Sequence, residues 1–169
     1  MFSYDFNMRK FIIIVLFVYL SPLNSNAASL IGRLGIGMTN QVANGITAIS
    51  MKIQQSRSSA IGGLFALDSS SSGVLYALGL KGYKYIYEEP QLNFYSSLAA
   101  NTFTYLTILD EIQQGYQIDA TFGAEFNFQG LESIGFSFEF GMGYSKVNDD
   151  AHFKTLGYNT LASAIHFYL

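Results

Sequence analysis

The chain of 169 residues has no cysteine, no tryptophan and only two prolines, and only 12% of its residues are charged. The absence of cysteine excludes disulfide bonds, thiol catalysis and the lipid-modified cysteine of a lipoprotein. A soluble secreted domain carries about a quarter of its residues as charges, so this chain has about half the usual share. Aromatic residues are abundant instead, with 15 phenylalanines and 12 tyrosines. Something other than water must therefore cover the aromatic side chains.

The charged and histidine residues that are present exclude further classes of function. Nine basic against twelve acidic residues give a net charge of −3, which does not favour nucleic acid as a partner. A hydrolase or acyltransferase needs an activated nucleophile with a base within reach, and only His152 and His166 are available. Neither histidine adjoins a serine in a hydrolase arrangement, and the acidic segment around His152 is typical of a solvated loop. We therefore expect no enzyme, no cofactor and no bound metal.

Residues 1–27 predict a secretory signal peptide. Arg9 and Lys10 precede a ten-residue apolar run, and Ser25 and Ala27 form the small pair of a cleavage site. The run is about half the ~20 residues that a membrane-spanning helix needs, so a permanent helical anchor is the less favoured alternative. Met8 directly before Arg9 is the expected translation start. Residues 28–169 then form one domain, because no Pro/Ser-rich linker divides them.

Residues 116–146 alternate between two kinds of side chain with a period of two, interrupted only at 129–132. This period is typical of two β-strands in a hairpin. Bulky aromatic residues occupy one face, and glycine, serine, threonine and a few carboxylates occupy the other. The second face is too small and too polar to be the core of a soluble protein. The pattern predicts an inside-out barrel, with lipid around it.

The same alternation extends over the whole of residues 28–169 and predicts eight strands, near 30–39, 45–55, 59–67, 73–84, 91–105, 115–128, 133–146 and 157–169. Because an open edge in lipid leaves backbone groups without partners, the fold class is a closed antiparallel eight-stranded up-and-down transmembrane β-barrel. In the fifth strand the alternation of side-chain types is interrupted at Phe103 and Tyr105. This interruption predicts a bulge or the exit from the membrane. Residues 147–156 are the longest expected loop. Tyrosines near strand ends are expected to form belts among the lipid headgroups, namely Tyr76, Tyr83, Tyr85, Tyr87, Tyr116 and Tyr144.

The parity of each strand assigns charged residues to the interior and rings to the lipid. The expected polar network of the lumen consists of Arg33, Lys52, Lys81, Asp119, Glu125, Glu139 and His166. The expected lipid-facing rings are Phe122, Phe126, Phe136, Phe138, Phe140 and Phe167. The network is expected to be a satisfied structural core, with a polar gate or proton-linked plug as the less favoured alternative. The lumen of eight strands is just wide enough for side chains to fill, so an open pore is not expected.

Three segments carry a resemblance to a known family: Phe126-Asn-Phe128, Gly135-Phe-Ser-Phe-Glu-Phe-Gly141 and the final Ile165-His-Phe-Tyr-Leu169. Together with the signal peptide and the eight strands, they resemble the small porin-like outer-membrane β-barrels of Gram-negative bacteria, of the outer-membrane protein A, X and W type. The resemblance implies export through the Sec pathway, periplasmic chaperones, insertion by the barrel assembly machinery, and contact with outer-membrane lipid and lipopolysaccharide. The family's last strand usually ends in an aromatic residue, whereas this chain ends in Leu169.

The sequence leaves three functions open. The preferred one is a structural or surface-interaction protein of the outer membrane. The second is a barrel for uptake of small hydrophobic compounds, along a route lined by Ile46, Leu75 and Tyr95. The third is a soluble secreted ligand-binding barrel, as lipocalins are, with its aromatic residues turned inward.

Overall fold

The computed structural model describes residues 30–42, 46–70, 73–107, 112–156 and 162–169. The expected signal peptide and the translation start at Met8 lie outside these ranges. Every regular element that is described is a strand, and no described helix is long and apolar enough to cross a membrane. The strands are β1 (Leu34–Val42), β2 (Ile46–Ser56), β3 (Ser59–Ser70), β4 (Gly73–Glu89), β5 (Leu92–Thr107), β6 (Ile112–Phe128), β7 (Leu131–Val147), β8 (Asp150–Thr155) and β9 (Ala162–Tyr168).

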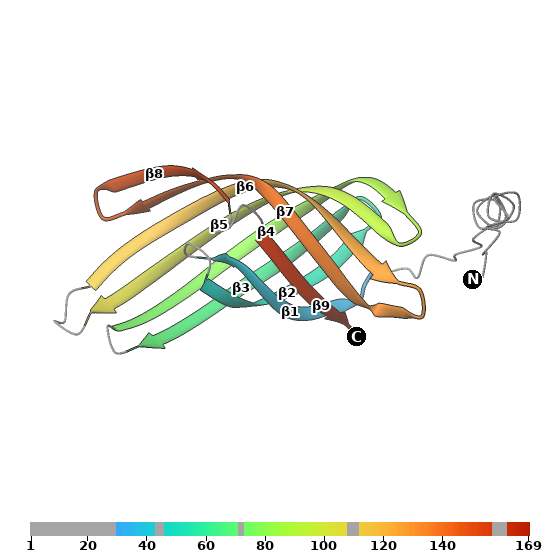
Figure 1. The fold of residues 1–169 in the computed structure, drawn as a ribbon, viewed down its shortest axis with the longest axis horizontal. Helices are drawn as coiled ribbons and strands as arrows, with labels where there is room; N and C mark the ends of the chain where they lie inside the picture. Colours follow the sequence, from blue (N-terminus) through green and yellow to red (C-terminus); the bar gives the residue numbers. More distant parts are fainter. Residues whose placement is uncertain (1–29, 43–45, 71–72, 108–111, 157–161) are drawn as a thin grey trace, which may run out of the picture.

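The strands close into an eight-stranded antiparallel up-and-down barrel, as the alternation predicts. Each strand from β1 to β7 pairs with the next one in the chain, and β9 pairs with both β7 and β1. The pairing of Gly35 with Tyr168 and of Thr39 with Ala164 marks the two ends of this closing seam. Figure 1 shows the tilted ring with its long axis horizontal. One end, which we call the turn end, carries the turns after β2, β4 and β6 and the end of β9; the opposite end is the loop end.

Two separate strands, β8 and β9, together take the place of the eighth strand of the barrel, which corrects one expectation. Residues 147–156 were expected to be a loop, but β8 covers Asp150–Thr155 and pairs with the loop-end half of β7, while β9 pairs with its other half. Val147 pairs directly with Asp150, so the connection is a two-residue turn. Asn148 has φ 52°, in the left-handed region that asparagine tolerates better than most residues. The exposed loop at this place is therefore much shorter than the sequence indicated.

The bulge predicted as one explanation for Phe103 and Tyr105 in β5 is also wrong. The β5–β6 pairing runs without a register shift from Leu92 to Leu106, and Phe103 lies on the same inner face as Tyr95. Its ring is 7% exposed. Phe103 breaks the alternation of residue types, because it is a large apolar residue inside the barrel, but it does not break the alternation of directions.

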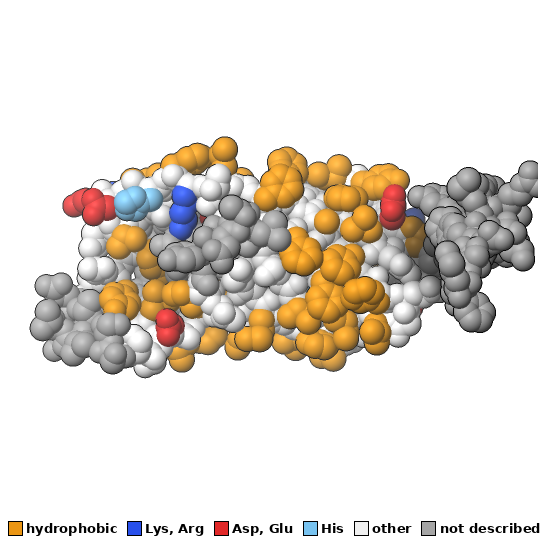
Figure 2. Space-filling model, in the orientation of Figure 1, with side chains coloured by type: hydrophobic (Ala, Val, Ile, Leu, Met, Phe, Trp, Pro, Cys, Tyr) orange, Lys and Arg blue, Asp and Glu red, His pale blue; other side chains and the backbone are white. Residues whose placement is uncertain are grey.

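Buried and exposed positions alternate along the strands in the opposite sense to that of a soluble protein. In β2 Ser50 and Lys52 are 1% exposed, whereas the alternating Ile49 and Met51 are 49% and 47% exposed. The space-filling view in Figure 2 shows hydrophobic side chains over much of the visible wall and charged ones toward the two ends. The barrel therefore has a polar inside and an apolar outside, which positions the charged residues described next.

Candidate functional site

The first feature of the lumen is an ion pair between β2 and β6. Lys52 Nζ lies 2.6 Å from Glu125 Oε2, and the two side chains are 1% and 0% exposed. The Tyr168 hydroxyl at the end of β9 donates a hydrogen bond to Glu125 Oε1. Both oxygens of the buried carboxylate are thus satisfied, as a charge away from water requires.

A second ion pair joins β4 and β7. Lys81 Nζ lies 2.6 Å from Glu139 Oε1 and 2.7 Å from Oε2, and it also donates to the Gln41 side-chain oxygen. The Tyr95 hydroxyl donates to Glu139 Oε1 at 2.8 Å, and the Thr121 hydroxyl donates to Oε2 at 2.8 Å. Strands β1, β4, β5, β6 and β7 therefore all contribute to this one pair.

Three tyrosine rings link the two ion pairs. Lys52 Nζ lies 4.6 Å from the ring centroid of Tyr83, 5.3 Å from Tyr95 and 5.5 Å from Tyr85, and Lys81 Nζ lies 4.9 Å from Tyr83. These are cation–π distances. Tyr83 and Tyr85 were expected in a headgroup belt, but they are only 7% and 6% exposed. Both lie an even number of residues from Lys81 on the same strand, so their side chains point to the same face as Lys81. This spacing is the signal in the sequence that identifies them as inward residues.

Asp119 and His166 lie in the lumen beside the two ion pairs. Asp119 is fully buried and accepts hydrogen bonds from Gln117 Nε2 at 2.9 and 2.8 Å, while Lys81 and Lys154 supply the nearby positive charge. His166 Nε2 lies 2.9 Å from the Ser50 hydroxyl oxygen. Asp119 thus joins the network through an amide, and His166 through a hydroxyl.

Arg33 is placed differently from the other expected network residues. It precedes β1 at the turn end, and its guanidinium crosses the closing seam. It donates to the backbone oxygens of Tyr168 and Leu169, the latter at 3.3 Å, and to the Ser133 hydroxyl at 3.0 Å. Arg33 therefore fastens the end of β9 and does not reach the two central carboxylates.

Several large side chains of the lumen pack against glycines of neighbouring strands. A Cβ atom added to Gly123 would lie 2.7 Å from both the Tyr95 ring and the Glu139 side chain, and one added to Gly35 would lie 2.8 Å from the Tyr168 ring. Further pairs of this kind are Gly115 with Phe103, Gly135 with Glu125 and Tyr168, and Gly143 with Asp119. The inward glycines thus provide the room in which rings and carboxylates fill the barrel.

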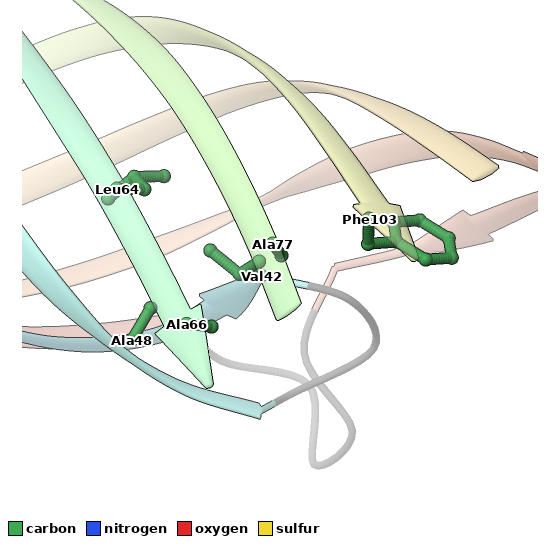
Figure 3. Close-up of a cluster of buried hydrophobic side chains, with 6 residues drawn as sticks. All are labelled: Val42, Ala48, Leu64, Ala66, Ala77 and Phe103. Atoms are coloured by element: carbon green, nitrogen blue, oxygen red, sulfur yellow. The ribbon is translucent and has the colours of Figure 1, made fainter. Parts of the chain in front are cut away.

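The loop-end part of the lumen contains an apolar cluster. Figure 3 shows a cluster of buried side chains there, made of Val42, Ala48, Leu64, Ala66, Ala77 and Phe103. Ile46 and Leu75, two residues of the expected uptake route, pack against it. Tyr95, the third, lies instead among the tyrosines at the ion pairs. The structure therefore separates the three residues into two different layers.

The six expected lipid-facing rings lie on the outside of the barrel. Phe122, Phe138, Phe140 and Phe167 are 42–58% exposed. Phe126 and Phe136 are half-buried because they stack on one another, with ring centroids 5.6 Å apart. The inward aromatic set that a soluble ligand-binding barrel requires is absent at these six positions.

The Ser50–His166 contact places a hydroxyl within reach of a histidine base, and the sequence alone did not indicate it. Both side chains are nearly fully buried, at 1% and 2% exposed, and His166 Nδ1 has no hydrogen-bond partner among the described residues. A catalytic dyad needs substrate access and a group that orients the base. The contact has neither, so its chemistry is that of a structural hydrogen bond. The described residues also contain no group of three or more metal-ligating side chains.

Comparison with known proteins gives no assignment, since no family model, no curated protein and no solved structure matches this chain.

Proposed function

We propose that this chain is an integral outer-membrane β-barrel protein of Gram-negative bacteria, with a structural or surface-interaction role and a lumen closed by side chains. The observation that carries the proposal is the apolar outer wall around a charged interior. In a lipid bilayer this arrangement is favourable, because the exposed rings meet acyl chains and the charged groups of the two ion pairs, Lys52, Lys81, Glu125 and Glu139, point inward.

The height of the apolar wall supports a membrane location. On β7 the outward residues from Ile134 to Tyr144 are apolar or aromatic. Ten steps of about 3.4 Å, tilted by about 40°, give an apolar height of about 26 Å. A transmembrane barrel has an apolar band of about 25 Å, so the two values agree. Tyr116 and Tyr144, with ring centroids 6.1 Å apart, lie toward the loop end of this band, where amphipathic rings suit lipid headgroups.

The filled lumen supports a barrel that does not conduct ions. The two ion pairs, the tyrosines around them and the apolar cluster occupy successive parts of the interior. We therefore propose a role that depends on the presence of the barrel in the membrane or on its exposed end, without ion conduction. The partners that follow are outer-membrane lipid and lipopolysaccharide, with the barrel assembly machinery and periplasmic chaperones during biogenesis.

Three measurements test this proposal together. Cell fractionation should place the protein in the outer membrane, and the folded form should migrate differently from the boiled form on a gel. Planar bilayers containing the purified protein should show no single-channel steps. A protein released without detergent, with one mobility before and after boiling, would contradict the membrane location; regular conductance steps would contradict the closed lumen.

The uptake alternative has one observation in its favour, the apolar cluster at the loop end. The cluster residues are at most 7% exposed, and the ion pairs lie deeper in the same lumen. Uptake would require this cluster to open sideways above the ion pairs. Accumulation of a hydrophobic tracer in cells with the protein, compared with cells without it, decides between the two functions.

A further inference from the structure

Strand β8 has one edge that no described strand covers. It pairs with β7 from Asp150, opposite Val147, to Thr155, opposite Met142, and no described strand pairs with its other side. The pairing of β1 with β9 ends at Thr39, so β1 does not cover this edge. Figure 1 shows the β7–β8 ribbon at the margin of the loop end. A free edge presents unpaired backbone N–H and C=O groups that can add another strand.

The sequence of β8 is complementary to itself in the antiparallel direction. Asp150, His152 and Lys154 share one face of the strand, and Ala151 and Phe153 share the other. If two copies pair with His152 opposite His152, each Asp150 lies opposite Lys154 of the second copy, and each Ala151 lies opposite Phe153. A two-fold contact of this kind repeats every favourable pair twice. Lys154 also lies in the field of Asp119 in its own chain, and the pairing gives it a second carboxylate.

We propose that β8 is a homodimerisation edge, on which a second copy of the chain adds its own β8 antiparallel and centred on His152. The occupant is a second copy because the acidic and basic ends of β8 match each other in this register. Asp150, Ala151, His152 and Phe153 are all exposed in the single chain, so the edge is accessible at these positions.

Single cysteines test the register, since the chain contains no cysteine of its own. Directly opposed residues of antiparallel strands have Cα atoms about 4.5–5.5 Å apart, within disulfide range. His152→Cys should therefore give a disulfide-linked dimer under mild oxidation in membranes or micelles. Ala151→Cys alone should not, because two copies of residue 151 would lie about 8 Å apart. A mixture of Ala151→Cys and Phe153→Cys chains should crosslink. Ser69→Cys, exposed on β3 at the same end, is the matched control.

A charge reversal tests the ion pairs across the dimer. Asp150→Lys places a lysine opposite Lys154 of the second copy at both ends of the contact. The dissociation constant of the dimer should rise about fivefold or more, which corresponds to the loss of two exposed ion pairs. Asp149→Lys makes the same change of charge one residue earlier, in the turn, and should leave the dimer unchanged. The gel mobility of the folded monomer shows that each variant still forms the barrel.

Two results would overturn the proposal. The first is a crosslinking yield for His152→Cys no higher than for Ser69→Cys, which is also the outcome if another protein covers the edge. The second is equal dimer strength for Asp150→Lys and Asp149→Lys. Both measurements need only the folded barrel, so they remain decisive whatever membrane it occupies.

Discussion

Lys52 and Glu125 are 73 residues apart in the chain, yet their side chains form an ion pair of 2.6 Å inside the barrel. They come from β2 and β6, which are not neighbours in the ring. The contact therefore crosses the lumen, and it exists only when the barrel is closed. Its loss should affect the whole fold.

Removal of one partner of this pair should destabilise the barrel strongly. Lys52→Met leaves Glu125 buried without its cation, and we expect the free energy of unfolding to fall by about 3–5 kcal/mol. The double variant Lys52→Met with Glu125→Gln should recover much of this loss, because it removes both charges. Urea unfolding in micelles, followed by circular dichroism, measures both values. Lys84→Met, at an exposed position of β4, is the control; a loss of the same size there would contradict the assignment.

The seating of rings on glycines predicts which glycines tolerate a methyl group. Gly123→Ala would bring a Cβ to within 2.7 Å of Tyr95, and we expect a loss of about 1–3 kcal/mol from overpacking. Gly63→Ala on the outer wall meets nothing within 4 Å, so its stability should stay equal or rise slightly. The same unfolding assay compares the two variants. Equal effects would show that the lumen is looser than described.

Arg33 is expected to stabilise the pairing of β9 with β1, which closes the barrel. Arg33→Gln removes the hydrogen bonds to the backbone oxygens of Tyr168 and Leu169, and we expect a local loss of about 1 kcal/mol. Amide hydrogen exchange should become several-fold faster in β9 and remain unchanged in β4 and β5. Arg57→Gln, in the exposed turn after β2, changes the same charge away from the seam. Faster exchange spread evenly over all strands would count against a fastening role.

The outer wall offers a direct test of lipid contact. Phe138 is 42% exposed, and in the proposed membrane location an arginine at this position would face the bilayer. We expect Phe138→Arg to lower the stability in bilayers by about 2–4 kcal/mol. In a barrel surrounded by water the same change would be a surface substitution, worth about 0.5 kcal/mol at most. Ser69→Arg at the loop end is the control, and refolding yields in liposomes give the comparison.

The face of each residue could be predicted from the sequence because the period of a strand is fixed at two. Lys52 and Lys81 lie inside as their parity requires, and so do Glu125 and Glu139. Which lysine meets which carboxylate could not be predicted. That pairing depends on the stagger of the strands around the ring, and the alternation within one strand does not contain this information.

The wrong expectations have a common physical origin. Each inferred the position of a residue from its side-chain type, whereas the backbone geometry of the strands determines that position. Tyr83 and Tyr85 were assigned to headgroups as amphipathic rings, although their parity matches that of Lys81. Phe103 indicated a bulge because it is apolar at an inward position, where a local apolar cluster accommodates it. The segment 147–156 is polar like a loop, but its backbone groups pair with β7.

The glycine positions of the interior have a consequence for how such a barrel changes over time. Several of the bulky groups pack against a glycine of the next strand, so several obstructions follow one another along the axis. Trimming any one of them leaves the others in place. A lineage that turned this protein into a conduit would have to lose many of them together, while single losses would weaken the wall without opening a passage.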